Sequence, residues 1–164
     1  MIRAIARVRG LPVALVACAY AAAVLTLTWL TQDGHLGDAM YGVLSMVVMA
    51  FPLSIVGDSV YDAVIGRRHD DPSYGRQYVE MGWPGIAMAL VLVLLLTWRR
   101  TRLAGQVAGW ALTAVVLLTG VGMVFGWAPR RPYGWPFLVY GLIMAIGLIA
   151  VRRSAPKDTG TEKA

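Results

Sequence analysis

The sequence has a single cysteine, Cys18, among its 164 residues. One cysteine permits neither an internal disulfide nor a cysteine-based metal site. The chain also lacks a phosphate-binding glycine-rich loop, a zinc-protease helix motif and a recognisable serine, histidine and aspartate set. We therefore expect a non-enzymatic protein without a cofactor. An enzyme that acts on lipids stays open as a third alternative and needs His35 or His69 beside a carboxylate.

Charged side chains and histidine are missing from five long apolar stretches. The stretches cover residues 11–31, 39–57 (or to 65 with a polar extension), 83–98, 106–128 and 134–151. Each is close to the roughly 20 residues that a helix needs to cross a bilayer. Hydrophobic residues make up 58% of the chain, and the mean hydropathy is +0.62. The sequence predicts an all-α integral membrane bundle of five hydrophobic helices, in one domain over residues 1–153, with a disordered polar tail at 154–164.

The positive charge is scattered in small groups beside the apolar stretches, although the formal net charge is +6. Nucleic-acid binding requires basic residues gathered on one soluble face, so we expect no nucleic-acid partner. Groups of arginines at the ends of apolar stretches are typical of topology signals. Together with the richness in alanine, glycine and valine, they indicate a multi-pass protein of a bacterial cytoplasmic membrane.

The N-terminus has the layout of a signal peptide as well as of a first membrane helix, because Arg3, Arg7 and Arg9 precede an apolar stretch. Residues 15–18 also resemble the sequence at which bacterial lipoproteins are cleaved and lipidated on cysteine. The chain stays apolar well beyond Cys18. We expect an uncleaved first helix, and lipidation of Cys18 stays open.

The third and fifth stretches share an outline. Gly-Trp-Pro opens both, at residues 82–84 and 134–136, and an arginine pair closes both, at 99–100 and 152–153. Tryptophan suits the headgroup region, proline is tolerated in the first helical turn, and terminal arginines mark the cytoplasmic end. The pattern predicts two parallel helices that finish inside the cell.

The second stretch decides the topology. If all five stretches cross, eight basic residues face the cytoplasm and seven face outside, which is almost no bias. If the second stretch enters and returns, the counts become ten and five. Pro52 removes a backbone donor in the middle of residues 40–65, so it either kinks a fifth span or turns a re-entrant segment. Segment length favours five crossings, and both topologies stay open.

Most acidic residues and both histidines lie between Asp33 and Glu80. Asp58 and Asp62 are one helical turn apart and carry oxygen ligands, to which His35 or His69 would add an imidazole. This pattern permits a cation site at one membrane face. The alternative is that both aspartates lie on the wet face of a helix.

Small residues repeat along the fourth and fifth stretches, where they allow helices to approach closely. The candidate helix-packing residues are Gly105, Gly109, Gly122, Gly126, Gly141 and Ala145. We expect a partner or a second copy to use these faces.

Asp38-Ala39, Tyr41-Gly42-Val43, Pro52 and Ser54 resemble a family of small multi-span membrane proteins from actinomycetes. That family has an Asp-Ala opening and an Ala-Pro-x-Ser pattern in its second helix, and Phe51 replaces the alanine here. The family has no established activity, so the resemblance implies membrane location and helix content. It also implies that the second stretch crosses.

The leading hypothesis is an accessory, regulatory or immunity-type subunit in the lipid bilayer, which acts on a membrane protein partner or as a homo-oligomer through helix and loop contacts. The alternative is a small channel or carrier for a neutral or cationic solute, with the acidic cluster at its mouth. Classical ion-coupled carriers are disfavoured because they place ionisable groups at membrane depth.

Overall fold

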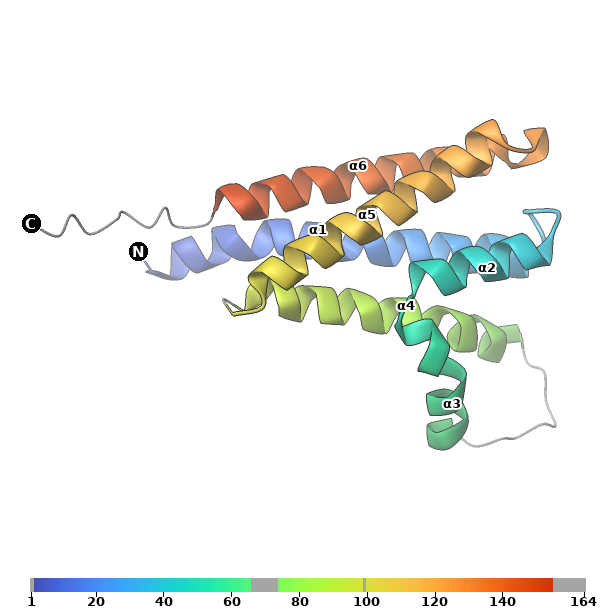
Figure 1. The fold of residues 1–164 in the computed structure, drawn as a ribbon, viewed down its shortest axis with the longest axis horizontal. Helices are drawn as coiled ribbons and strands as arrows, with labels where there is room; N and C mark the ends of the chain where they lie inside the picture. The colour runs from blue at the N-terminus through green and yellow to red at the C-terminus, as the bar shows by residue number, and fades with distance from the viewer. Residues whose placement is uncertain (1, 66–73, 99, 155–164) are drawn as a thin grey trace, which may run out of the picture.

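In a computed structural model of the chain, which describes residues 2–65, 74–98 and 100–154, all regular structure of the described residues is helical. The elements are α1 (Ile2–Gln32), α2 (Ala39–Met49), α3 (Leu53–Ile65), α4 (Tyr74–Thr97), α5 (Arg102–Phe125), the 3₁₀ turn η1 (Ala128–Arg130) and α6 (Arg131–Arg153). The four long helices lie along one common direction (Figure 1). The prediction of an all-α bundle is confirmed for these residues, and four helices are long and apolar enough to cross a membrane.

The chain runs back and forth between two ends of the bundle (Figure 1). Helix α1 leads away from the end at which α6 finishes, and α2 and α4 both begin at the opposite end. Helix α5 returns to that opposite end, and α6 leads back. We call the end formed by residues 33–38, 78–80 and 127–131 the distal end. Helices α4 and α6 run parallel, as their repeated Gly-Trp-Pro sequences predict.

Helix α1 supplies the central seam of the core. Val16, Tyr20, Ala23 and Leu27 recur at helical spacing, and their side chains are fully buried. The seam lies against α4 and α6, and α5 packs mainly on α6. Because lipid tails are as apolar as these side chains, close van der Waals packing holds such a bundle together inside a membrane.

Glycines allow the helices of this chain to approach one another. A Cβ atom on Gly109 would clash with Leu148 of α6, and one on Gly141 would clash with Leu117 of α5. At Gly105 it would lie 2.8 Å from the Leu95 carbonyl carbon. Atoms of the chain itself lie close against these three positions, and the use of the neighbouring helix faces by a partner or a second copy stays a prediction.

The second apolar stretch is not one helix. Helix α2 ends at Met49, residues 50–52 form a turn, and α3 leaves sideways, across the direction of the bundle (Figure 1). The described residues thus contain four helices long enough to cross a membrane and one shorter apolar helix, and the choice between a Pro-kinked fifth span and a re-entrant segment stays a prediction. Pro52 cannot donate a backbone hydrogen bond, and its ring disrupts the preceding helical turn.

Side chains satisfy two carbonyls that the break sets free. The Tyr20 hydroxyl donates to the Met49 carbonyl over 2.6 Å, and the Ser54 hydroxyl donates to the Val47 carbonyl over 2.8 Å. The apolar part of α1 is Gly10–Gln32, and Tyr20 lies near its centre. Helix α2 therefore starts at the distal end and stops about halfway along the bundle.

Helices α4 and α6 extend beyond the apolar stretches. Helix α4 begins at Tyr74 and α6 at Arg131, so Pro84 and Pro136 lie inside the helices instead of at their starts. Pro84 has no N–H for the Glu80 carbonyl, four residues earlier. That oxygen lacks its usual helical donor.

Candidate functional site

The turn between α1 and α2 shapes the distal end. Gly34 and Gly37 adopt positive φ angles of 70° and 69°, which glycine tolerates at little cost. The Asp38 carboxylate then accepts a 2.9 Å hydrogen bond from the Met40 N–H and caps α2. This turn sends α2 back alongside the bundle.

Arg130 joins this turn to the connection between α5 and α6. Its Nε donates a 2.6 Å hydrogen bond to the Leu36 carbonyl. Its guanidinium carbon lies 4.3 Å from the ring centre of Tyr41 and 5.3 Å from that of Trp127. A cation stacked on aromatic rings in this way holds the two connections together.

His35 lies among aromatic rings. Its ring centre is 4.9 Å from that of Trp29 and 5.3 Å from that of Tyr133, which it meets edge-on. Its Nδ1 is buried and has no hydrogen-bond partner in the part of the chain that the structure describes. The structure thus places His35 in an aromatic cluster at the distal end.

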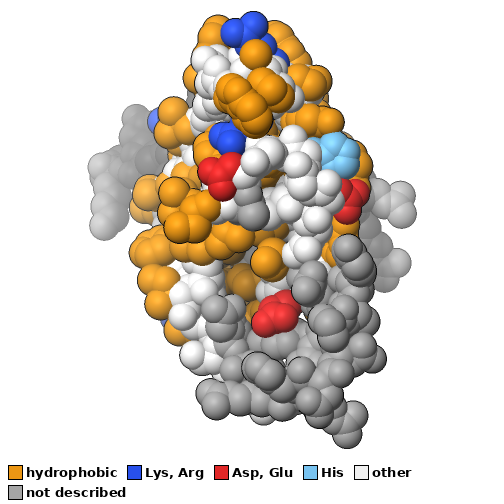
Figure 2. All heavy atoms as spheres, turned by 90° about the vertical axis from the view of Figure 1, so that its right-hand side faces the viewer, with side chains coloured by type: hydrophobic (Ala, Val, Ile, Leu, Met, Phe, Trp, Pro, Cys, Tyr) orange, Lys and Arg blue, Asp and Glu red, His pale blue; other side chains and the backbone are white. Residues whose placement is uncertain are grey.

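Two polar contacts tie α1 to the start of α4. The Tyr78 hydroxyl donates to the Asp33 carboxylate over 2.6 Å, and Gln32 Nε2 donates to the Met81 sulfur over 2.9 Å. Figure 2 views the distal end directly and shows a few acidic, basic and histidine side chains among hydrophobic and other side chains. These contacts position the α4 residues that line the adjacent cavity.

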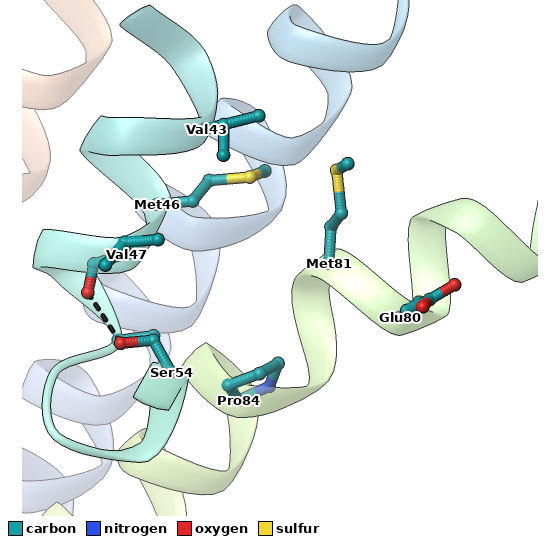
Figure 3. A pocket seen from close by; sticks show the side chains of 8 residues that line it. Val43, Met46, Val47, Ser54, Glu80, Met81 and Pro84 are labelled. Atoms are coloured by element: carbon teal, nitrogen blue, oxygen red, sulfur yellow. Dashed lines mark hydrogen bonds between the residues drawn. The ribbon is translucent and has the colours of Figure 1, made fainter. Parts of the chain in front are cut away.

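A cavity of about 470 Å³ lies between α2, the start of α3 and α4, and we call it the α2–α4 pocket. Its lining residues are Val43, Met46, Val47, Ala50, Ser54, Glu80, Met81 and Pro84. Met46 reaches toward Met81 from the facing helix, and Glu80, one turn before Pro84, turns its carboxylate away from both methionines (Figure 3). The pocket is an apolar space with one carboxylate at its edge.

The metal-site prediction is not tested. Asp58 and Asp62 lie on α3 with their side chains outside the described residues, and His69 is also outside them. Among the described residues, no three histidine, cysteine or acidic side chains come close enough to hold a metal ion.

The other predicted residues lie at several places. Gly122 faces the Tyr41 hydroxyl, Gly126 is an exposed residue at the end of α5, and Ala145 is half-buried on α6. Pro52 marks the break. Cys18 is exposed on α1, which continues as an unbroken helix to Gln32.

Tyr20, Arg130 and the polar wall of the pocket were not among the site residues predicted from the sequence. Tyr20 had a signal, because it places a hydroxyl group in the middle of an apolar stretch. For Arg130, the only signal in the sequence was that it belongs to an arginine pair. Glu80 was grouped with the acidic cluster, and the pattern showed nothing of the apolar neighbours that α2 brings to it.

No family model matches this chain, and neither does a curated protein or a solved structure. The resemblance to the actinomycete family therefore stays a prediction.

Proposed function

We propose that this chain is an accessory or regulatory protein of a bacterial cytoplasmic membrane, with four spans and a re-entrant segment formed by α2 and α3. The start of α1 and the end of α6 lie at one end of the bundle, and the end of α4 meets the start of α5 at that same end (Figure 1). Ten of the fifteen basic residues precede the apolar part of α1, lie between Thr97 and Leu103, or lie from Arg152 onward. The positive-inside rule then assigns this end to the cytoplasm and the distal end to the outside.

The observation that carries the accessory role is the exposed break between α2 and α3. Phe51 is 57% exposed, and Pro52 is exposed beside it. The hydrogen bond from Tyr20 to Met49 puts this break about halfway along the bundle. Irregular backbone at membrane depth is tolerated where protein covers it or where it lines a water-filled cavity. We infer that a second protein covers the break.

The surroundings of the break suit an apolar transmembrane helix. A groove of about 250 Å³ runs beside Pro52, between α3, α4 and α5. Its lining residues are Pro52, Leu53, Met88, Val91, Leu92, Leu95, Ala108 and Leu112. We call Phe51, Ile55 and this groove the partner face. Ile55 is 67% exposed, so the face continues along α3.

Photocrosslinking in native membranes tests the proposal. A benzophenone amino acid replaces Phe51, and a matched variant carries it at Leu118, an exposed residue on α5. We expect position 51 to give one protein adduct, identified by mass spectrometry as a different membrane protein, and position 118 to give lipid adducts only. Lipid adducts alone at position 51 would refute the proposal. An adduct of two copies of this chain would replace the accessory role with self-association.

A further inference from the structure

We propose that the α2–α4 pocket binds an amphiphilic organic cation, a molecule with an apolar body and one positively charged group. The volume of about 470 Å³ lies within the roughly 300–1,000 Å³ that is usual for small-molecule sites. Most of the lining residues lie on α2 and α4, away from the partner face, whereas Ala50 and Ser54 line the pocket on either side of Phe51. All walls of the pocket belong to this chain, so ligand binding needs no partner protein.

The walls suit an apolar body of variable shape. Val43, Val47 and Pro84 contribute rigid apolar surface, and Met46 and Met81 contribute flexible thioethers from opposite helices (Figure 3). Methionine side chains adapt to different ligands and are polarizable. Such walls select for apolar character more than for one exact shape.

The polar groups of the wall accept hydrogen bonds and do not donate them. The Ser54 hydroxyl gives its hydrogen to the Val47 carbonyl and keeps free lone pairs. The Glu80 carbonyl lacks its helical donor because of Pro84. No salt bridge or hydrogen bond to the Glu80 carboxylate is present among the described residues, and ionised carboxylates only accept.

A pocket wall whose polar groups only accept hydrogen bonds distinguishes between ligands by their charge. An anion would be repelled by Glu80, and a ligand that only accepts hydrogen bonds would leave every polar group of the wall unsatisfied. A cation compensates the carboxylate, which is half-buried beside apolar surface. Charge complementarity therefore identifies the ligand class.

The depth of Glu80 fits an amphiphile in a bilayer. The apolar part of α4 is Tyr78–Thr97, so Glu80 lies near its beginning, at the distal end. A ligand with its charge beside Glu80 and its body between Met46 and Met81 has its polar group near the membrane surface and its apolar part deeper. Amphiphilic molecules and side chains adopt this orientation at membrane interfaces.

Calorimetric titration of the purified full chain in a maltoside detergent tests the charge preference. The probe is tetraphenylphosphonium, and tetraphenylborate serves as an anion of nearly the same shape. We expect saturable binding of the cation only, and a rise of about tenfold or more in its dissociation constant in Glu80→Gln. Asp33→Asn is the charge-matched control, since asparagine keeps an acceptor for Tyr78 and should bind as the unaltered chain does.

A pair of neighbouring valines tests the location. Val47 lines the pocket, whereas Val48 is exposed and does not line it. We expect Val47→Phe to abolish binding of tetraphenylphosphonium and Val48→Phe to preserve it, with both variants eluting as the unaltered chain in size-exclusion chromatography. Equal binding of both probe ions, an unchanged affinity in Glu80→Gln, or equal effects of the two valine variants would each overturn the proposal.

Added phosphatidylethanolamine, a zwitterionic lipid with an ammonium group in its headgroup, separates the two sources of the positively charged group. If this lipid displaces tetraphenylphosphonium from the unaltered chain, its ammonium headgroup occupies the site, and the organic-cation chemistry is supported with a lipid as the source. If it does not compete, a free lipophilic cation is the ligand.

Discussion

The hydroxyl of Tyr20 donates a 2.6 Å hydrogen bond to the carbonyl of Met49 across a fully buried contact between α1 and the end of α2. In a continuous helix that carbonyl would accept from the backbone N–H of residue 53. The break after Met49 removes this partner, and Tyr20 replaces it. One side chain of α1 thus holds the end of α2 at the middle of the bundle.

Replacing Tyr20 with phenylalanine tests this anchor. The change removes one hydroxyl and leaves the Met49 carbonyl buried without its donor. We expect the free energy of unfolding, measured by titration with a denaturing detergent, to fall by about 1–2 kcal/mol. Tyr140→Phe is the matched control. Its hydroxyl meets the Thr26 hydroxyl at 3.3 Å in a half-buried contact, and we expect a loss below about 0.5 kcal/mol. Equal losses would show that the anchor has no special role.

Alanine substitutions at two glycines distinguish the cost of a steric clash between helices from the gain in helix propensity. At Gly105 a Cβ atom would lie 2.8–2.9 Å from backbone atoms of Leu95 and Leu96, which cannot move aside as a side chain can. We expect Gly105→Ala to lower the free energy of unfolding by about 1–3 kcal/mol. Gly10 has nothing within 4 Å of the same position, so Gly10→Ala should leave stability unchanged or raise it by roughly 0.5–1 kcal/mol. A neutral Gly105→Ala would contradict the close approach of α5 to the end of α4.

Arg130→Lys tests the link across the distal end. Lysine keeps the charge but loses the planar group that bonds the Leu36 carbonyl and stacks on Tyr41. We expect amide hydrogen exchange in residues 33–38 to become about tenfold faster, which corresponds to about 1.4 kcal/mol. Arg131→Lys, at an exposed neighbour, should leave these rates unchanged. Equal rates in both variants would mean that the contact of Arg130 does not hold the turn.

Single cysteines in a Cys18→Ala background test the topology. Val79 lies in the second turn of α4, at the distal end, and Thr101 lies just after α4, at the opposite end of the bundle (Figure 1). We expect an impermeant thiol reagent to label Val79→Cys in intact cells and to leave Thr101→Cys unlabelled until the membrane is opened. The reverse pattern would mean that the second segment crosses and that the proposed four-span topology is wrong.

The local sequence pattern was sufficient to predict the long helices. The absence of charge over stretches of about 20 residues predicted long apolar helices. The repeated Gly-Trp-Pro and Arg-Arg sequences predicted that two of them run parallel, because interfacial residues and arginines report on the ends of a helix. These signals come from neighbours along the chain and need no knowledge of contacts.

The path of residues 39–65 could not be predicted from such local signals. Pro52 was compatible with a kinked span and with a return, because proline weakens a helix without dictating where the chain goes next. The choice depends on groups far away in sequence, such as Tyr20, which offers Met49 a hydrogen bond at mid-bundle. A pattern along one segment contains no information about that donor.

The sequence by itself determined a chain of apolar helices with basic ends, because hydrophobicity, charge and helical period are local properties. The tertiary structure alone decided that α2 stops halfway, that Gly109 and Gly141 are filled by this chain's own leucines, and that Glu80 borders an apolar pocket. The physical reason is that hydrogen bonds and close packing between helices join residues that are distant in sequence, and these long-range contacts determine where a broken helix rests.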